Sequence, residues 1–444
     1  MSTEVKNKIG PTALFGFGTV GRAVFDILDK MGLGSNIKYI VVRDKQKHID
    51  KKIEGIVDTL FEDDMKIALE RLKEVDGIIE VMGGTDDAWT VVKTALEMNK
   101  KVTTANKALV STYMNELQVL LKEIGNDEDI RSFNWDYLHF EAAVAGGIPI
   151  IRSLLRDVQD VFRQNMQGFT TKKLYAILNG TSNFILTKME QGMSYVNSLQ
   201  LAQNVGYAEA DPSADVKGYD ARAKIHILEQ ILFSTNRKAD AIVCQGIEDI
   251  TNIDFEYASL LKGKIKLVAT TAKNSSGVST WVMPTLVPSY TDLAKTDGVR
   301  NIVCVDHPFL GTLSYSGEGA GGYATAHSVV SDIFDLSIVY PLGSLDPEKT
   351  SSIENDFEIP FYLRITVIDC IGIIADIGTL CSDLNISVDA VIQKPMGPKF
   401  DFVNDDLTFI VTTNVTPYKT VQLLKGKIEE MEWNKKPVFI MAMH

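Results

Sequence analysis

The stretch Thr12-Ala-Leu-Phe-Gly16-Phe-Gly18-Thr-Val-Gly21-Arg-Ala-Val-Phe-Asp-Ile-Leu28 decides the fold of the first part of the chain. A short apolar strand runs into a GxGxxG turn, and an amphipathic helix follows. This strand–turn–helix context favours a dinucleotide site, because Gly18 lets the backbone approach a pyrophosphate and the helix N-terminus supplies N–H donors. The alternative is a tight turn that binds nothing.

The residues after the second predicted strand, Lys38–Val42, bear on the choice of coenzyme. Arg43 follows this strand, where a carboxylate normally holds the ribose of NAD and an arginine accommodates the 2′-phosphate of NADP. Arg43 and Lys45 are cations in an acidic protein and favour NADP. Asp44 between them keeps NAD possible.

Two further predicted strands end in small or polar residues. Gly77–Met82 runs into Gly83-Gly84-Thr85, and Lys101–Thr104 runs into Ala105-Asn106-Lys107. The carboxyl ends of parallel strands line the ligand crevice of an open sheet. Lys107 is therefore a candidate for the nicotinamide end of that crevice, with a solvated surface lysine as the alternative.

Composition limits the class of protein. The 444 residues are 45% hydrophobic and 23% charged, as in soluble globular proteins with two or three domains. The net charge of −13 argues against nucleic acid and anionic membranes as partners. The start of the chain does not resemble a signal peptide, no transmembrane segment is predicted, and the four cysteines are scattered. We expect a cytoplasmic protein with reduced thiols.

The segment Phe140–Ile151 consists of small and apolar residues around one carboxylate, Glu141. Such a loop leaves backbone carbonyls without partners, and a monovalent cation such as sodium would satisfy both the carbonyls and the charge. Close backbone packing at a hinge explains the composition equally well.

From about residue 155 the pattern changes to a mixed α+β module. Strands are predicted at Lys173–Leu178, Lys264–Thr270, Ser279–Met283 and Asn301–Val305, and Asn179-Gly-Thr-Ser-Asn183 begins a helix with Thr181 or Ser182 as N-cap. A glycine cluster, Gly317–Gly322, precedes a helix over Ala324–Phe334. It is either a phosphate or ribose contact or only a turn.

Candidate catalytic and substrate-binding side chains are concentrated in the stretch Gly206-Tyr-Ala-Glu-Ala-Asp-Pro-Ser-Ala-Asp-Val-Lys-Gly-Tyr-Asp-Ala-Arg-Ala-Lys-Ile-His-Ile-Leu228. Apolar spacing predicts a helix from Val216 onward, which makes Asp220 and Lys224 an i,i+4 pair on one face. A surface ion pair is the ordinary interpretation. The acid-rich loop before the helix favours a functional one.

The C-terminal part alternates between strands and helices. Residues 341–359 read as a linker, and the strands and helices predicted after them give a βαββαβ order over 360–444, a ferredoxin-like unit. It carries no nucleophile and no metal cluster, so its expected role is binding or assembly.

Together these motifs resemble the homoserine dehydrogenase family over essentially the whole chain. The markers are GFGTVG (16–21), ANKALVS (105–111), EAAVAGGIP (141–149), LNGTSN (178–183) and GYAEADPSADVKGYDARAKI from Gly206. The C-terminal unit resembles an ACT domain, which in this family implies feedback by an amino acid, typically threonine. Its first turn, Asp369-Cys-Ile-Gly372-Ile, lacks the usual Pro-Gly pair, and no aspartate kinase module is fused.

The resemblance implies an α/β fold with a Rossmann NAD(P)-binding domain over 1–154, completed by about 311–340. A substrate and dimerisation domain would cover 155–310. It implies reversible reduction of L-aspartate 4-semialdehyde to L-homoserine, in threonine, methionine and isoleucine biosynthesis, by a dimer or tetramer. The alternatives are an amino-acid sensor with an inactive dehydrogenase domain and a dehydrogenase for another amino-acid aldehyde.

The resemblance also assigns roles to residues. Lys224 matches the proton-donating lysine, Lys107 a second lysine near nicotinamide and substrate, and Glu209 and Asp220 the carboxylates of the homoserine site. The full expected sets are Lys224, Lys107 and Asp220 for catalysis; Glu209, Gly206, Asp215, Asn179 and Thr181 for substrate; Gly16, Phe17, Gly18, Thr19, Val20, Gly21, Arg43, Lys45, Gly83, Thr104, Lys107, Gly319 and Gly321 for coenzyme; and the Glu141 carboxylate with the Val144, Gly146 and Ile148 carbonyls for sodium.

Overall fold

The computed structural model describes residues 9–50, 56, 60–124, 137–159, 172–307, 309–334, 351–394 and 407–444. The chain divides into two compact units, each built from segments that are far apart in the sequence. The first contains Met1–Leu178, Arg222–Ile242 and Arg300–Ser352. The second contains Asn179–Ala221, Val243–Val299 and Ile353–His444.

A six-stranded parallel sheet forms the centre of the first unit and confirms the predicted dinucleotide-binding architecture. The strand order is β3-β2-β1-β4-β5-β6, so the order reverses between β1 and β4. Open sheets bind their ligands at the carboxyl ends of the strands beside such a switch point. The bounds are β1 Thr12–Phe15, β2 Ile37–Val41, β3 Phe61–Glu62, β4 Gly77–Glu80, β5 Lys101–Thr104 and β6 Leu138–His139.

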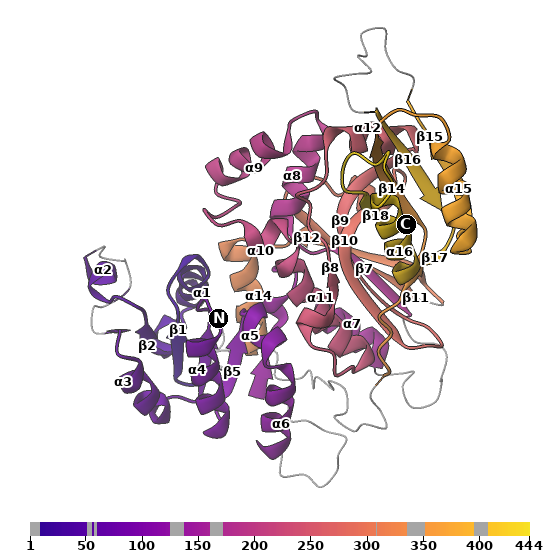
Figure 1. Ribbon diagram of the computed structural model, residues 1–444. Coiled ribbons are helices and arrows are strands. Elements are labelled where there is room, and N and C mark those ends of the chain that lie inside the picture. The colour runs from indigo at the N-terminus through magenta and orange to yellow at the C-terminus, as the bar shows by residue number, and fades with distance from the viewer. Residues whose placement is uncertain are drawn as a thin grey trace. The chain divides into compact units, whose positions relative to one another are not determined.

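Helices α1 (Thr19–Lys30) and α14 (Gly322–Phe334) pack together on this sheet, although they are far apart in the sequence. Figure 1 shows α14, in orange, among the purple elements of the first unit. Both helices contribute apolar residues to one core with β1 and β2. The remaining helices of the sheet region are α2 Gln46–Ile49, α3 Met65–Glu70, α4 Asp86–Glu97, α5 Lys107–Thr112, α6 Met114–Ile124 and α7 Ile150–Gln159.

The first unit also holds three antiparallel strands and most of a long helix. Strand β11 (Arg300–His307) pairs with β12 (Gly311–Glu318) and with β7 (Lys173–Ile177). Helix α11 covers Tyr219–Phe233 and belongs to this unit from Arg222 onward.

The second unit is built on the hairpin of β9 (Gly263–Lys273) and β10 (Val278–Pro288). The short strand β8 (Val243–Cys244) and β18 (Phe439–Met443) both pair with β10 in parallel. The helices outside the C-terminal segment are α8 Gly180–Glu190, α9 Tyr195–Asn204, α10 Ser213–Val216, α12 Asn252–Leu260 and α13 Asp292–Lys295.

The C-terminal segment has the predicted βαββαβ order, drawn in orange to yellow in Figure 1. Its antiparallel sheet order is β18-β14-β16-β15, the ferredoxin-like arrangement, and its two helices share one core with the sheet. The bounds are β14 Phe361–Val367, α15 Ile373–Asp383, β15 Val388–Ile392, β16 Leu407–Thr413 and α16 Tyr418–Glu429.

Two local predictions were wrong. Asn179, and neither Thr181 nor Ser182, caps α8, because its side-chain oxygen accepts from the Ser182 N–H at 2.7 Å. The helix expected from Val216 is broken at Gly218, whose φ of 80° is left-handed, and α11 starts only at Tyr219.

The linker predicted over 341–359 stays a prediction. Residues 341–350 lie outside the described residues. Near the end of the segment, Ile353 forms a bridge with Val278, and β13 (Glu358–Ile359) pairs with β17 (Thr416–Pro417). These pairings attach the end of the segment to the second unit.

Candidate active site

The β1–α1 turn has the geometry that a bound pyrophosphate requires. Gly16 has a φ of 99°, and a Cβ there would lie 2.6 Å from the Val81 carbonyl oxygen. A Cβ on Gly21 would lie 2.2 Å from the Gly16 carbonyl oxygen. Gly18 is different, since nothing lies within 4 Å of its Cβ position and it caps the N-terminus of α1. Two glycines thus close the turn, and the third leaves it open to a ligand.

The other expected residues of this turn differ in accessibility. The Phe17 ring is buried against Phe25 and Phe61, so only its backbone is available to a coenzyme. Val20 packs on the same core, whereas Thr19 is exposed. A cavity of about 410 Å³ lies beside α1, and its lining includes Phe17, Thr19, Arg22 and Tyr323.

The three charged residues after β2, Arg43, Asp44 and Lys45, differ in their side-chain partners. Lys45 forms an ion pair with Asp63 at 3.2 Å, and the Asp44 carboxylate accepts from the Lys47 N–H at the start of α2. Arg43 is exposed and makes no hydrogen bond or ion pair with the part of the chain that the structure describes. Of the three charged residues, Arg43 is the one whose side chain is available to a 2′-phosphate.

A buried carboxylate that sequence reasoning missed lies at the carboxyl end of β4. Glu80 is 0% exposed and accepts from Thr104 Oγ1 at 2.5 Å, Met82 N at 2.8 Å and Asn106 Nδ2 at 3.4 Å. Burial raises the pKa of Glu80 to about 7, although the hydrogen bond from Thr104 opposes this shift. The sequence signal that could have identified Glu80 is that it is the single acid in the apolar run Gly77–Met82.

Lys224 is buried on α11, with 8% of its surface exposed. Its ammonium donates to the Leu178 carbonyl at 2.7 Å, and Asn301 Nδ2 donates to the same oxygen at 3.0 Å. Leu178 follows β7 directly and opens the LNGTSN motif. Lys224 is therefore held at the end of β7 and is not the surface ion-pair partner of the ordinary interpretation.

The next residue of that motif, Asn179, organises the carboxylates of the second unit. Its Nδ2 donates to Asp215 at 2.6 Å and to Asp220 at 2.9 Å. Asp220 is the second residue of α11, four residues before Lys224. Three of the predicted substrate and catalytic residues are thus joined by hydrogen bonds, and one amide holds two acids close together.

The remaining predicted substrate residues lie on the loop between α9 and α10 or contact it. Thr181 Oγ1 donates to the Tyr207 carbonyl at 2.9 Å, and Gly206 has a φ of 79°. Glu209 is exposed, and its carboxylate makes no hydrogen bond or ion pair within the described ranges. This loop presents a carboxylate to solvent, and the structure does not bring Glu209 into the Asn179 network.

Glu141 is the second carboxylate with a strongly perturbed environment. It is 1% exposed, and its two oxygens accept from the Ile151 and Arg152 backbone N–H groups, both at 2.9 Å. Burial, and then the nearby Asp332, raise the pKa of Glu141 to about 8. In the described parts of the chain, no group of three or more His, Cys, Asp or Glu side chains is placed to hold a metal.

The three carbonyl residues expected with Glu141 lie on a tight turn. Ala145 and Gly146 have φ values of 57° and 55°. The Gly146 carbonyl accepts from Ser328 Oγ at 2.7 Å, and the Ile148 carbonyl accepts from the Ile150 N–H at 2.7 Å. Each of these oxygens keeps a second lone pair.

The glycine cluster before α14 packs against this turn. A Cβ on Gly146 would lie 2.7 Å from the Gly319 carbonyl carbon, and a Cβ on Gly319 would lie 2.0 Å from the Asn301 side chain. Gly321 has a φ of 127° and open space around it. Close packing thus explains Gly319, whereas Gly321 leaves room for a ligand.

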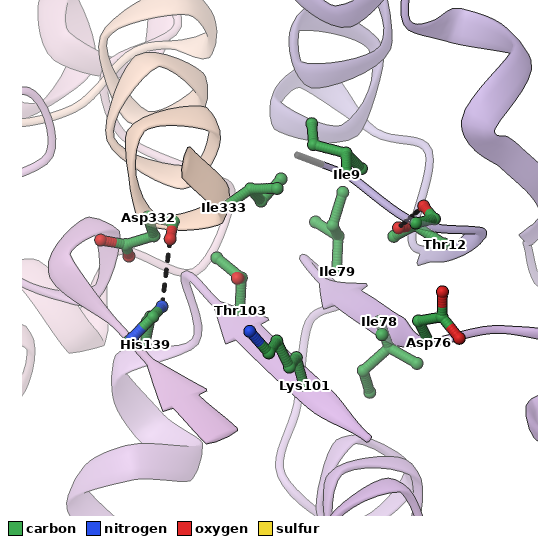
Figure 2. Close-up of a pocket in the computed structure, with 12 residues that line it drawn as sticks. Ile9, Thr12, Asp76, Ile78, Ile79, Lys101, Thr103, His139, Asp332 and Ile333 are labelled. Carbon is green, nitrogen blue, oxygen red and sulfur yellow. Dashed lines mark hydrogen bonds between the residues drawn. The ribbon is translucent and has the colours of Figure 1, made fainter. Parts of the chain in front are cut away.

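A second cavity, of about 270 Å³, lies at the opposite end of the sheet (Figure 2). Its lining includes Gly77 and Lys101, the first residues of β4 and β5, together with Asp76 and His139. The His139 ring nitrogen Nδ1 lies 3.0 Å from the Asp332 carbonyl, as the dashed line shows. Because this cavity is at the amino ends of the strands, it is not the coenzyme crevice.

None of the helices described is long and apolar enough to cross a membrane.

Known proteins resemble the chain over its whole length. The family model described as Homoserine dehydrogenase matches residues 158–334, and that of the homoserine dehydrogenase NAD-binding domain matches residues 16–127. A homoserine dehydrogenase of Neisseria gonorrhoeae is 33% identical, over 97% of both chains.

Solved structures of homoserine dehydrogenases also resemble the chain. The crystal structure of a homoserine dehydrogenase from Thiobacillus denitrificans has a TM-score of 0.82 at 30% identity and covers 98% of this chain and 97% of its own. A hyperthermophilic archaeal homoserine dehydrogenase in complex with NADPH has a TM-score of 0.58 at 27% identity. It covers 74% of this chain and 98% of its own.

Proposed function

This chain belongs to the homoserine dehydrogenase family, and from that premise we propose how its residues interconvert L-aspartate 4-semialdehyde and L-homoserine. The enzyme is an oxidoreductase with an NAD(P)-binding domain. The alternatives, an inactive amino-acid sensor and a dehydrogenase for another amino-acid aldehyde, are not favoured, because a homoserine dehydrogenase matches 97% of the chain.

Lys224 carries the proton chemistry. The observation that supports this role is its buried ammonium, which donates to the Leu178 carbonyl at 2.7 Å. When bound, the reduced coenzyme supplies a hydride to the aldehyde carbon. The ammonium stabilises the developing alkoxide and then donates a proton to it, and in the reverse direction the neutral amine accepts the alcohol proton. Lys107, the first residue of α5, is the second lysine of the reaction.

The substrate ammonium requires a carboxylate once it leaves water. Asp220 and Asp215 supply two, which Asn179 holds at 2.9 and 2.6 Å. Glu209 adds a third from the exposed loop after Gly206, and Thr181 fixes that loop through Tyr207. The negative charge of this group favours an amino-acid substrate over an uncharged aldehyde.

The coenzyme is NADP, and Arg43 selects it. Its guanidinium is exposed and uncommitted among the described residues, whereas Lys45 is paired with Asp63. An arginine binds a phosphate through a planar pair of N–H donors. The main-chain turn at Gly16, Gly18 and Gly21 binds the pyrophosphate. The turns after β4 and β5 receive the nicotinamide half, with Gly83 on the first of them, and Gly321 lies at the ribose. Thr104, expected from the sequence at the coenzyme, is 0% exposed and bonded to Glu80, so it does not touch the coenzyme.

The donor set around Glu141 fits a sodium ion. A carboxylate that burial drives toward protonation lies in a turn whose carbonyls at Val144, Gly146 and Ile148 are oxygen ligands of the kind that hard cations prefer. A bound cation would keep Glu141 ionised and would brace the turn between η5 (Glu141–Ala143) and α7.

The C-terminal unit is an ACT domain that binds an amino acid such as threonine, and the enzyme is a cytoplasmic homo-oligomer in the threonine, methionine and isoleucine pathway. The ferredoxin-like strand order and the continuous pairing of β18 with β10 support a regulatory attachment.

The test follows NADPH absorbance with aspartate semialdehyde and NADP⁺ absorbance with homoserine. Lys224→Met should lose turnover while NADPH still binds. Lys266→Met is the matched control, because Lys266 is buried and bonded to Asp297 and Thr296. This control should lower the melting temperature but keep turnover. Full activity of Lys224→Met would transfer the proton chemistry to another residue, Lys107 first.

A further inference from the structure

Glu80 is a buried carboxylate that none of the roles above uses. It lies at the carboxyl end of β4, in the parallel sheet that binds the coenzyme. A buried carboxylate without a cation partner is costly unless hydrogen bonds compensate. Within the described residues, Glu80 accepts three hydrogen bonds and forms no ion pair. These three bonds offset part of the cost of burying the carboxylate, and they tie it to the elements around it.

The three donors come from the end of β5 and from the turns that follow β4 and β5. Met82 N–H belongs to the β4–α4 turn, which continues into Gly83 and Gly84. Thr104 Oγ1 is on the last residue of β5, and Asn106 Nδ2 belongs to the β5–α5 turn that follows. Asn106 Nδ2 also donates to the Gly84 carbonyl at 2.8 Å, so the two turns are bonded to each other as well as to Glu80.

The second turn passes this restraint on to Lys107. Thr104 Oγ1 accepts from the Asn106 N–H at 2.9 Å while it donates to Glu80. The Asn106 side-chain oxygen caps α5 by accepting from the Leu109 N–H at 3.0 Å. Lys107 is the first residue of that helix, so the cap that Glu80 orients fixes the backbone from which its side chain extends.

We propose that Glu80 is a positioning residue of the reaction, whose carboxylate holds the β4–α4 and β5–α5 turns in the arrangement that receives the nicotinamide half of the coenzyme and places Lys107. This inference rests on the assignment of Gly83 and Lys107 to that half of the coenzyme. Glu80 itself touches neither substrate nor coenzyme, and it acts through Thr104 and Asn106.

Glutamine cannot replace this carboxylate. If its NH₂ group faces Thr104, that hydroxyl can no longer donate its proton to position 80. If the amide is flipped, the NH₂ group meets the Met82 and Asn106 donors. In either orientation at least one buried donor loses its acceptor at position 80. The two turns therefore shift, although glutamine keeps the shape of the side chain.

The experiment compares Glu80→Gln with Asp254→Asn, which also neutralises a buried carboxylate but lies in the second unit, where it pairs with Arg364. Coenzyme affinity is titrated by NADPH fluorescence, and KM for homoserine, kcat and melting temperature are measured on the same samples. Glu80→Gln should weaken NADPH binding and lower kcat by about tenfold to a hundredfold. The KM for homoserine should change much less. Asp254→Asn should lower the melting temperature alone.

A third variant, Lys107→Met, distinguishes failure of the Glu80 inference from failure of the proposed function. If Lys107→Met loses turnover while Glu80→Gln binds NADPH and turns over as the wild type does, the Glu80 inference is overturned and the proposed function stands. The inference is likewise overturned if Glu80→Gln behaves as Asp254→Asn does, with a lower melting temperature and unchanged coenzyme affinity. If Glu80→Gln weakens NADPH binding but Lys107→Met is fully active, the positioning of the coenzyme turns is supported and the role of Lys107 is wrong.

Discussion

The His226 imidazole Nδ1 lies 2.9 Å from the Ser111 hydroxyl, in a buried hydrogen bond. Ser111 is on α5, which begins at Lys107, and His226 is on α11, two residues beyond Lys224. The two helices that carry the lysines assigned to the reaction are therefore tied directly to each other within the first unit. The Nε2 atom of His226 bonds the Arg237 carbonyl at 2.8 Å, so both ring nitrogens are used.

This bond predicts a pH dependence of stability. Burial lowers the pKa of His226, so the neutral ring is the folded form. Its contribution to stability is complete above the unfolded pKa of about 6.5 and declines as the pH falls toward the folded pKa. Urea unfolding at pH 5.5 and pH 8 should show a larger loss for the wild type than for His226→Gln. Parallel losses in the two proteins would contradict this account.

Replacement of Arg43 should change coenzyme choice. Arg43→Ala removes a charged donor to the 2′-phosphate, and such bonds contribute about 1.5–3 kcal/mol, so KM for NADP should rise by roughly tenfold or more while KM for NAD stays constant. Lys45→Ala is the control, because Lys45 is already paired with Asp63. A larger effect of Lys45→Ala on the NADP/NAD ratio would assign the phosphate to Lys45 instead.

Removal of sodium should destabilise the turn at Glu141. Burial raises the pKa of Glu141 from its ordinary value of 4.5 to about 8. Without the cation, its contribution is therefore full below pH 4.5 and is lost as the pH rises through 8. At pH 9, sodium chloride should raise the melting temperature of the wild type above that in tetramethylammonium chloride. Glu141→Gln should not respond, and Glu97→Gln, on the exposed face of α4, should respond as the wild type does. Equal responses of all three proteins would exclude a cation at Glu141.

Asn179 holds two like charges together, and its removal should separate them. Asn179→Ala loses the α8 cap, which costs about 1 kcal/mol, and frees Asp215 from Asp220. KM for homoserine should rise while NADPH affinity is kept. Ser194→Ala is the matched control, since Ser194 caps the neighbouring helix α9. It should lower stability without changing KM for homoserine.

The contact between α12 and the C-terminal strands predicts a stability effect. Arg364 pairs with Asp254, which is 0% exposed and also accepts from Tyr362. Arg364→Met leaves this carboxylate buried without its cation, which should lower the free energy of unfolding by about 3–5 kcal/mol. Denaturant unfolding measures the change. The double variant Arg364→Met with Asp254→Leu should recover much of it, and no recovery would locate the loss elsewhere.

Local patterns were enough to predict several elements. The glycines at 16, 18 and 21 and the alternation after residue 360 act through neighbouring residues, so the parallel sheet and the βαββαβ order could be read from the sequence. The cap of α8 could not, because Asn179, Thr181 and Ser182 are all good caps and the acids that fix Asn179 lie more than 30 residues away.

The positioning residues were missed for the same physical reason. Glu80 and His226 lie within apolar patterns, and their partners Thr104 and Ser111 come from other elements. No spacing rule joins them. Lys107 and Lys224 were candidates already, from a place after a strand and from the i,i+4 spacing, and the resemblance then assigned their roles.

The pairing of β10 with β18 has a consequence for how the protein is made. Residues 289–438 separate the two strands, so β10 emerges from the ribosome long before its partner. The short strand β8 is made before β10 and pairs with Trp281 and Val282. The part of the edge at Thr285 and Leu286 waits for β18, on the order of ten seconds at about 5–20 residues per second. An open edge of this kind recruits other chains. Chaperones that bind the unfinished chain during translation should therefore raise the soluble yield of this enzyme.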